Sequence, residues 1–168
     1  MPNFNRTGEE HFNLISALHK SVRGSDPDAA LYWLSRMLEG GEDPKFLARR
    51  LVRMSIEDIG LADPMAQATC LRSWETFERL GSPEGELALA QAVVYLALAP
   101  KSNAVYVSYN NARQSANKTG SLSPPKHILN APTDLMKKEG YGRDYEYDHD
   151  YLNGFSGQNY FPEEMERQ

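Results

Sequence analysis

Apolar side chains recur at helical spacing through most of the first 120 residues. The stretch 27–39 shows the pattern in full, because four apolar residues fall on one helical face: Ala30, Leu34, Met37 and Leu38. Asp26 can cap the first turn, and Pro27 suits the first helical position, where no N–H is needed. Gly40-Gly41 supplies an end. The stretch is therefore predicted to be one complete amphipathic helix.

An Asp or Ser followed by Pro recurs every 17 to 20 residues, at Asp26, Asp43, Asp63 and Ser82. This spacing suits one helix and a short turn each. With the apolar periodicity it predicts helices over residues 9–22, 27–39, 44–59, 64–80, 83–99 and 102–117. The first is expected to bury Phe12, Ile15, Leu18 and Val22. The fifth is apolar almost all round and is expected to be the central, most buried helix.

The character of the chain changes after Asn117. Residues 118–125 carry loop signals, and a short helix is predicted from about Ala131–Asp134 to Gly140. Five of the nine tyrosines lie between Tyr141 and Tyr160 without a period, which favours an irregular arm whose rings dock on the body or on a neighbouring subunit. The predicted fold is all-α, with six to seven helices: a linker over 1–8, a helical domain over 9–120, and a loop, short helix and aromatic arm over 121–168.

The amino-acid composition limits the kinds of protein that this chain can be. The chain has 168 residues, 40% of them hydrophobic and 24% charged, as in a soluble globular protein. No apolar run is long enough for a membrane helix, and the single cysteine makes a Cys-based zinc site improbable and favours a reducing, intracellular setting. Residues 1–120 carry 13 basic and 14 acidic side chains, whereas residues 121–168 carry 5 and 9. A protein that binds nucleic acid over its whole surface would be more basic.

Catalytic motifs are missing from the sequence. It has no glycine-rich loop with lysine for a nucleotide phosphate, so the chain alone is expected not to be an enzyme, with no catalytic, cofactor or metal residues. Glu57-Asp58 is interpreted as a solvated or salt-bridged helix end, because neighbours on a helix point about 100° apart. Metal binding by His127 or by Asp148-His149-Asp150 is the less favoured reading. Cys70 is expected to be a buried thiol.

Two sets of residues remain candidates for binding. Lys45, Arg49 and Arg53 share one helical face with Arg50 alongside, and could meet DNA phosphates or pair with carboxylates; net charge favours pairing. The second set is Tyr32 and Trp33, which are adjacent and cannot both enter one core. One is expected in the core, and the other, with Arg23, at a contact between subunits.

Several stretches resemble a known family in the same order: RGSDPDAALYWLSRMLEGGEDP (23–44), SIEDIGLADP (55–64), AQAVVYLALAPKSN (90–103), NAPTDLMKKEGYG (130–142) and the ending YEYDHDY…QNYFPEE. They are similar to the C-terminal region of the RarA/MgsA family of clamp-loader-like AAA+ ATPases, which includes the Werner-helicase-interacting ATPases. The loop KTGSLSPPKHI (118–128) departs from the family pattern, which leaves the role of that loop open.

The resemblance implies a place in a larger machine. It implies a collar-like helical domain that assembles an ATPase into a homotetramer at stalled replication forks. It further implies partnership with DNA and single-strand-binding protein, and a cytoplasmic, nucleoid-associated location without a membrane. ATP and Mg²⁺ would bind in an ATPase module outside this chain. The alternative from the residues themselves is a nucleic-acid-binding module that uses the Lys45, Arg49, Arg50 and Arg53 face.

Overall fold

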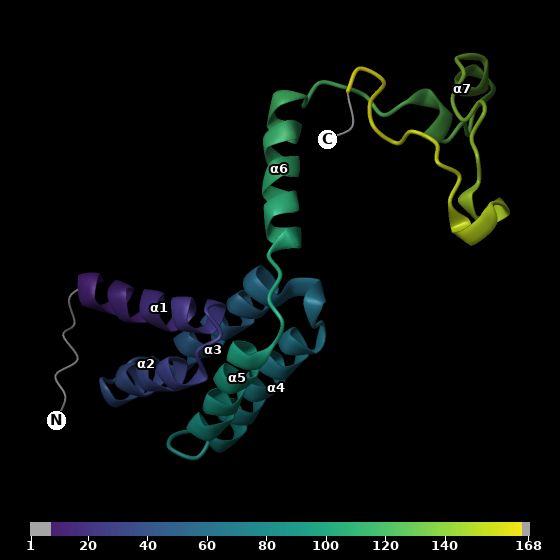
Figure 1. The fold of residues 1–168 in the computed structure, drawn as a ribbon. Coiled ribbons are helices and arrows are strands. Elements are labelled where there is room, and N and C mark those ends of the chain that lie inside the picture. The colour runs from purple at the N-terminus through teal and green to yellow at the C-terminus, as the bar shows by residue number, and fades with distance from the viewer. Residues whose placement is uncertain (1–7, 166–168) are drawn as a thin grey trace. The chain divides into compact units, whose positions relative to one another are not determined.

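Helices make up the whole of the regular structure in the computed structural model, which describes residues 8–165 (Figure 1). Within that range no strand occurs, so the all-α prediction is confirmed. Most of the predicted linker, residues 1–7, lies outside the described residues. The helices are α1 (Gly8–Arg23), α2 (Pro27–Glu39), α3 (Pro44–Met54), α4 (Met65–Leu80), α5 (Glu86–Leu98), α6 (Ala104–Lys118) and α7 (Asp134–Lys138). None of the described helices has both the length and the apolar character needed to cross a membrane.

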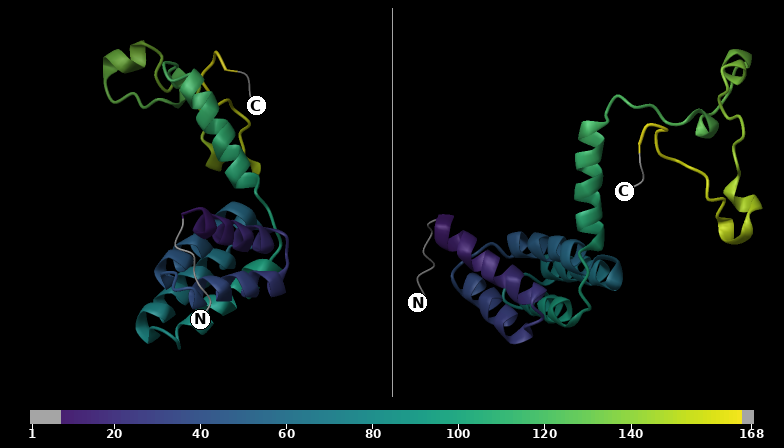
Figure 2. Two further views of the ribbon diagram at one scale, coloured as in Figure 1. Left: turned by 90° about the vertical axis from the view of Figure 1, so that its left-hand side faces the viewer. Right: turned by 45° about the horizontal axis from the view of Figure 1, so that its top comes forward.

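The chain divides into two compact units, Met1–Arg113 and Gln114–Gln168, with the division inside α6. The predicted boundary between residues 120 and 121 stays a prediction. In the first unit, helices α1–α5 form one bundle, which both views in Figure 2 show. In it α5 lies against each of α1–α4.

Three of the four proline-associated starts work as predicted. The side chains of Asp26, Asp43 and Asp63 accept the main-chain N–H groups of Ala29, Lys45 and Met65 at 3.0, 3.0 and 3.1 Å. Each carboxylate satisfies a donor that the first turn leaves unpaired.

The fourth start, at Ser82-Pro83, was predicted wrongly. The peptide bond between the two residues is cis, α5 begins only at Glu86, and Ser82 Oγ donates to the Glu86 carboxylate at 3.2 Å. The turn lies directly against α4 at Gly85. A Cβ added to this glycine would lie 2.8 Å from the Cα of Phe77.

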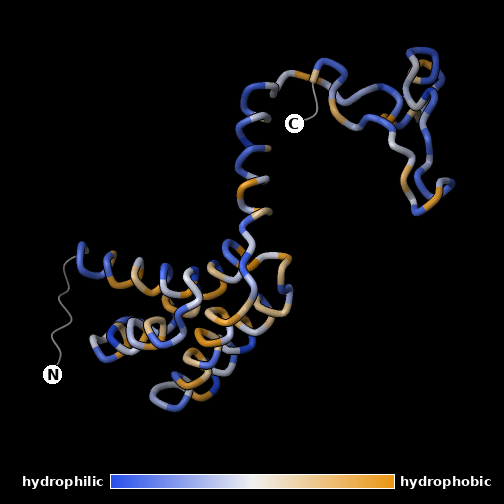
Figure 3. Tube along the Cα trace, in the orientation of Figure 1, coloured by the Kyte–Doolittle hydropathy of each residue, from blue (hydrophilic) through white to orange (hydrophobic). Residues whose placement is uncertain are grey.

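The core lies between α1–α5, where hydrophobic positions face inward along each helix (Figure 3). Fully buried side chains come from all five helices and the turn after α3: Leu18, Val22, Leu34, Met37, Leu47, Leu51, Met54, Ile59, Cys70, Leu89, Val93 and Leu96.

Two burial predictions need correction. Phe12 is 68% exposed, because the neighbouring His11 takes the inward position instead, with its ring 5.0 Å from Phe46 and its Nδ1 2.6 Å from Glu42. Helix α5 is central but not buried all round, since Leu87 and Leu98 are 75% and 68% exposed.

The third helix does not run unbroken to Ile59 as predicted. It ends at Met54, and the chain continues as a π-helical turn (Ser55–Ile59) and a 3-10 turn (Gly60–Ala62). Ser55 Oγ donates to the Val52 carbonyl at 2.6 Å, and Gly60 follows at φ 52°, a conformation that suits glycine. The wider turn changes the directions of Glu57 and Asp58.

The second unit contains α7, capped by Thr133 Oγ1, which accepts from Met136 N at 3.2 Å, and an arm held by its own side chains. Asp148 accepts from Ser156 N and Ser156 Oγ at 3.0 and 2.7 Å, and also from Tyr160. Gln158 bridges to Glu146, whose N–H donates to Gln158 Oε1 at 3.2 Å. The arm is therefore irregular, as predicted, yet closely hydrogen-bonded.

Candidate functional site

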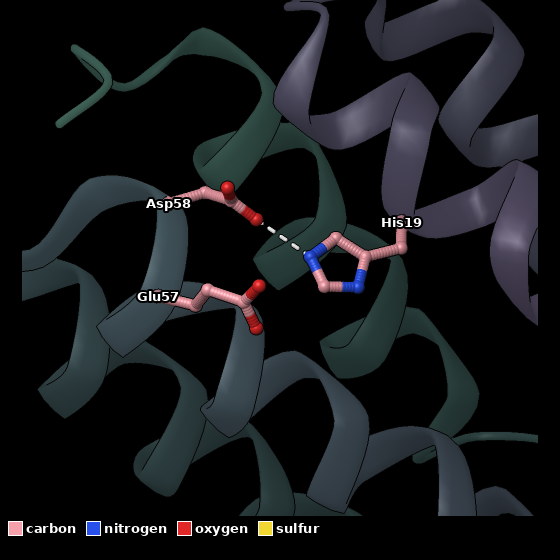
Figure 4. Close-up of side chains that lie close together, drawn as sticks. All are labelled: His19, Glu57 and Asp58. Carbon is pink, nitrogen blue, oxygen red and sulfur yellow. Dashed lines mark hydrogen bonds and ion pairs between the residues drawn. The ribbon is translucent and has the colours of Figure 1, made fainter. Parts of the chain in front are cut away.

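Four charged or polar side chains from α1 and the π-helical turn meet at one point, which we call the polar junction: His19, Arg23, Glu57 and Asp58. His19 Nε2 lies 2.6 Å from Asp58 Oδ2, and Arg23 Nε donates to Asp58 Oδ1 at 2.9 Å. Arg23 Nη2 is 3.6 Å from Glu57 Oε1. Figure 4 shows both carboxylates reaching toward His19 from the same turn.

Asp58 is the centre of the polar junction. Its side chain is only 6% exposed, so the carboxylate needs partners to offset the loss of water. Arg50 Nη2 lies 3.3 Å from the other ring nitrogen of His19, Nδ1. Arg23 Nη2 lies 3.3 Å from Nε2 as well, so guanidinium groups approach both ring nitrogens. Because the Asp58 carboxylate oxygen 2.6 Å from Nε2 is an acceptor, a hydrogen bond there needs the proton on Nε2. Hydrogen bonding to Asp58 in turn raises the pKa of Arg23.

The main chain of Asp58 links the polar junction to the start of α6. Its carbonyl accepts the Ser102 N–H at 2.8 Å. Beside it Arg53 pairs with Glu57 at 3.1 Å and places its guanidinium over the Tyr106 ring, 5.6 Å from the centroid.

A cavity of about 440 Å³ opens at this place, lined by Arg23, Glu57, Asp58, Lys101, Ser102, Asn103 and Tyr106. Lys101 Nζ donates to the carbonyls of Ala97 and Ala99 at 3.0 and 2.6 Å, so it closes the end of α5. Burial lowers the pKa of Lys101. Both signs of charge line the cavity: Arg23 pairs with Glu57 and Asp58, whereas Lys101 is held by neutral oxygens.

The polar junction as a whole was missed at the sequence level. Glu57 and Asp58 both reach the Arg23 guanidinium from a π-helical turn that the sequence reading did not predict. The expected salt-bridged helix end is confirmed, with Arg53 pairing to Glu57 as anticipated. The signal that a sequence reading could have used is His19 and Arg23, one turn apart on α1.

The potential ligand atoms of His19, Glu57 and Asp58 lie within 4.8 Å of one another, the one such group found among residues 8–165. A metal ion would need both carboxylates, which the Arg23 guanidinium already bridges. A cation there would have to displace that guanidinium. The arrangement therefore serves as an ion-pair junction between α1 and the turn after α3.

The four residues of the predicted basic face on α3 differ in their exposure and in their partners. Lys45 and Arg49 are exposed, whereas Arg50 is half-buried against His19 and Arg53 is held by Glu57. Whether this face contacts DNA stays a prediction.

The two adjacent aromatics on α2 separate as the sequence indicates. Trp33 packs against the core and Tyr32 is 52% exposed. Arg36 covers both rings and donates to Tyr32 Oη at 2.9 Å. Arg23 is engaged within its own chain. The subunit-contact hypothesis for Arg23, Tyr32 and Trp33 stays a prediction, and Tyr32 is the member most available for it.

The remaining candidates have structural partners. His127 Nε2 lies 2.7 Å from the Asn159 carbonyl, and Asp148 is occupied by Ser156 and Tyr160. Cys70 is buried, as expected, and burial raises the pKa of its thiol to about 12.

These observations define an all-α protein in which the polar junction joins α1 to the turn after α3. The chain belongs to the family described as MgsA AAA+ ATPase C terminal, whose model matches residues 24–168. It is 61% identical over 163 residues to the replication-associated recombination protein A of Coxiella burnetii and 50% identical to that of Escherichia coli K12. Both matches cover 96% of this chain, but only 37% and 36% of those relatives.

A eukaryotic relative extends the family. The chain is 46% identical over 146 residues to the ATPase WRNIP1 of Dictyostelium discoideum, which covers 87% of this chain and 17% of that protein. The chain thus spans well under half the length of these relatives. The recognition of the RarA/MgsA family from sequence is confirmed.

Proposed function

We propose that this chain is the oligomerisation domain of a replication-associated recombination ATPase. It assembles identical subunits into a homotetramer. The proposal is supported by family membership and by one structural observation, the exposed apolar side chains of the hydrogen-bonded aromatic arm.

The arm presents large apolar side chains while its own hydrogen bonds fix their positions. Tyr147, Phe155 and Leu152 are 54%, 74% and 86% exposed. The arm is held from within by Asp148 and Gln158. Aromatic side chains fixed in place lose little further entropy on binding, and they are enriched at protein interfaces. Such a surface suits contact with another subunit.

The test is the mass of the chain in solution, measured by multi-angle light scattering at high micromolar concentration. An oligomer is expected, and Tyr147→Ser with Phe155→Ser should lower its mass. Leu61→Ser, which changes a 76% exposed leucine outside the arm, is the matched control and should not. A monomer at high concentration would refute the oligomerisation role. Tyr32→Ser tests the α2 contact in the same assay, and an unchanged mass would exclude it.

The names of the relatives support a role for the whole protein in replication-associated recombination. The parent ATPase would act at stalled replication forks, bind DNA and single-strand-binding protein, and take ATP and Mg²⁺ in a module outside this chain. It would work in the cytoplasm at the nucleoid. The DNA-dependent ATPase activity of the full-length protein, compared with a version lacking residues 8–168, tests whether assembly supports that activity.

DNA binding by α3 is the second candidate, and the exposure of Lys45 and Arg49 favours it. Each phosphate contact made by a cation weakens as salt rises. The double variant Lys45→Glu with Arg49→Glu should abolish binding of a duplex oligonucleotide at low salt. Binding that is absent in the unmodified chain, or unchanged by the variant, would exclude this role.

A further inference from the structure

The charged side chains that line the cavity beside the polar junction differ in their exposure. The Arg23 side chain is 48% exposed, whereas those of Glu57 and Asp58 are 16% and 6% exposed. Both carboxylates are also occupied, since Asp58 accepts from Arg23 and contacts His19, and Glu57 accepts from Arg53. A molecule that enters the cavity therefore meets the guanidinium more readily than the carboxylates.

Lys101 adds a second positive charge to the cavity, and no carboxylate of residues 8–165 pairs with it. Besides the two carbonyls at the end of α5, its Nζ donates to Ser25 Oγ at 3.1 Å. These three bonds use all three protons of the ammonium and fix its position. Burial lowers the pKa of Lys101, so an anion in the cavity would stabilise its charged form.

Two side chains of the cavity wall keep donors that the described part of the chain does not use. Arg23 bonds through Nε and Nη2, and its Nη1 has no partner among residues 8–165. Ser102 Oγ accepts from Ala104 N at 3.3 Å, and its own proton has no acceptor within the same range. Unused donors beside two positive charges suit a ligand that is anionic and rich in acceptor oxygens.

We propose that this cavity binds the phosphate group of a phosphate ester. The phosphate lies between Arg23, Lys101 and Ser102, where the guanidinium and the hydroxyl donate hydrogen bonds and the ammonium supplies charge. This inference goes beyond the oligomerisation role and does not depend on it.

The cavity has room for more than the phosphate group. Its volume of about 440 Å³ lies within the ~300–1,000 Å³ of small-molecule sites. Tyr106 provides an aromatic wall, and the Arg53 guanidinium lies over its ring at 5.6 Å from the centroid. The organic part of the ester is expected to lie against Tyr106. Two sources share this chemistry, a small sugar phosphate and the backbone of a single-stranded nucleic acid.

Calorimetric titration of the full chain tests the site, with ribose 5-phosphate as one probe and a short oligothymidylate as the other. Lys101→Gln removes the charge but keeps N–H donors for the carbonyls that end α5, and it should weaken binding about tenfold. Lys20→Gln removes an exposed charge outside the cavity and is the matched control, which should bind as the unmodified chain does. Circular dichroism verifies that each variant is folded.

Ser102→Ala keeps the test decisive if Lys101→Gln fails to fold. This small change removes one proposed donor to the phosphate and should weaken binding several-fold. In NMR spectra of the unmodified chain, the amide signals of Ser102 and Tyr106 should shift as the probe is added.

The two probes distinguish the sources of the phosphate. Binding of ribose 5-phosphate supports a small ester as the ligand, and binding of the oligothymidylate alone supports a nucleic-acid backbone. If neither probe binds, or if Lys101→Gln and Lys20→Gln weaken binding equally, the proposed site is wrong. Binding that Ser102→Ala leaves unchanged would also overturn the proposed position of the phosphate.

Discussion

Replacing Asp58 by Asn tests whether the polar junction stabilises the helical body. Asparagine has about the same size as aspartate and keeps one acceptor oxygen. It lacks the charge that faces Arg23, and its N–H₂ group would face one of the two donors, His19 or Arg23. Hydrogen bonds to charged groups contribute about 1.5–3 kcal/mol each. The Arg23 side chain is 48% exposed and so contributes at the low end, whereas His19 is buried.

The expected loss is about 2 kcal/mol in the free energy of unfolding, or roughly 4–8 °C in Tm for a chain of this size. Urea titration followed by circular dichroism at 222 nm measures it. Asp58→Ala should cost more, about 3 kcal/mol, because it leaves both donors without an acceptor.

The matched control is Glu75→Gln on α4, where the carboxylate is 65% exposed and lies 3.7 Å from Arg79. Exposed ion pairs of this kind contribute little, so the control should change stability by less than about 0.5 kcal/mol. If Asp58→Asn is no more harmful than Glu75→Gln, the polar junction does not stabilise the fold and the reasoning fails.

Three further predictions concern other parts of the molecule. Gly85→Ala should destabilise the chain by about 1–3 kcal/mol in the same titration, because the new methyl group would overlap Phe77. Cys70 should stay unmodified by iodoacetamide at pH 8 in the native chain and react in urea, since its pKa is raised to about 12. Hydrogen bonds from Tyr160 and Ser156 lower the pKa of Asp148 from its ordinary value of 3.8. The charged carboxylate therefore stabilises the arm at pH values above 3.8, and this stabilisation is lost as the pH falls through the lowered pKa. The Ser156 amide signal in NMR should follow that titration, and Asp148→Asn should abolish it.

Local chemistry made most of the fold predictable. The signals for α1–α4 depend on neighbours in sequence: three Asp-Pro starts, the glycines that end helices and the apolar spacing. They predict the bounds of these helices to within a few residues. The fourth start failed because the Ser82 hydroxyl bonds to the Glu86 carboxylate rather than capping a main-chain N–H, in a turn that lies against Phe77 of α4. The place of His11 beside Glu42 and Phe46 likewise involves residues far along the chain.

The polar junction depends even more on residues that are far apart in the sequence. His19 and Asp58 are separated by 39 residues, and their meeting requires α1 to pack over a π-helical turn that helical periodicity does not reveal. Sequence identifies amphipathic helices but not which of their faces the fold leaves uncovered.

Asp58 gives the molecule a mechanical property. One residue holds α1 through its side chain and the start of α6 through its carbonyl, 2.8 Å from Ser102 N. The Arg53–Tyr106 contact adds a second link beside it. A displacement at the start of α6 would therefore act on α1 through Asp58 as well as through the chain that connects α5 to α6.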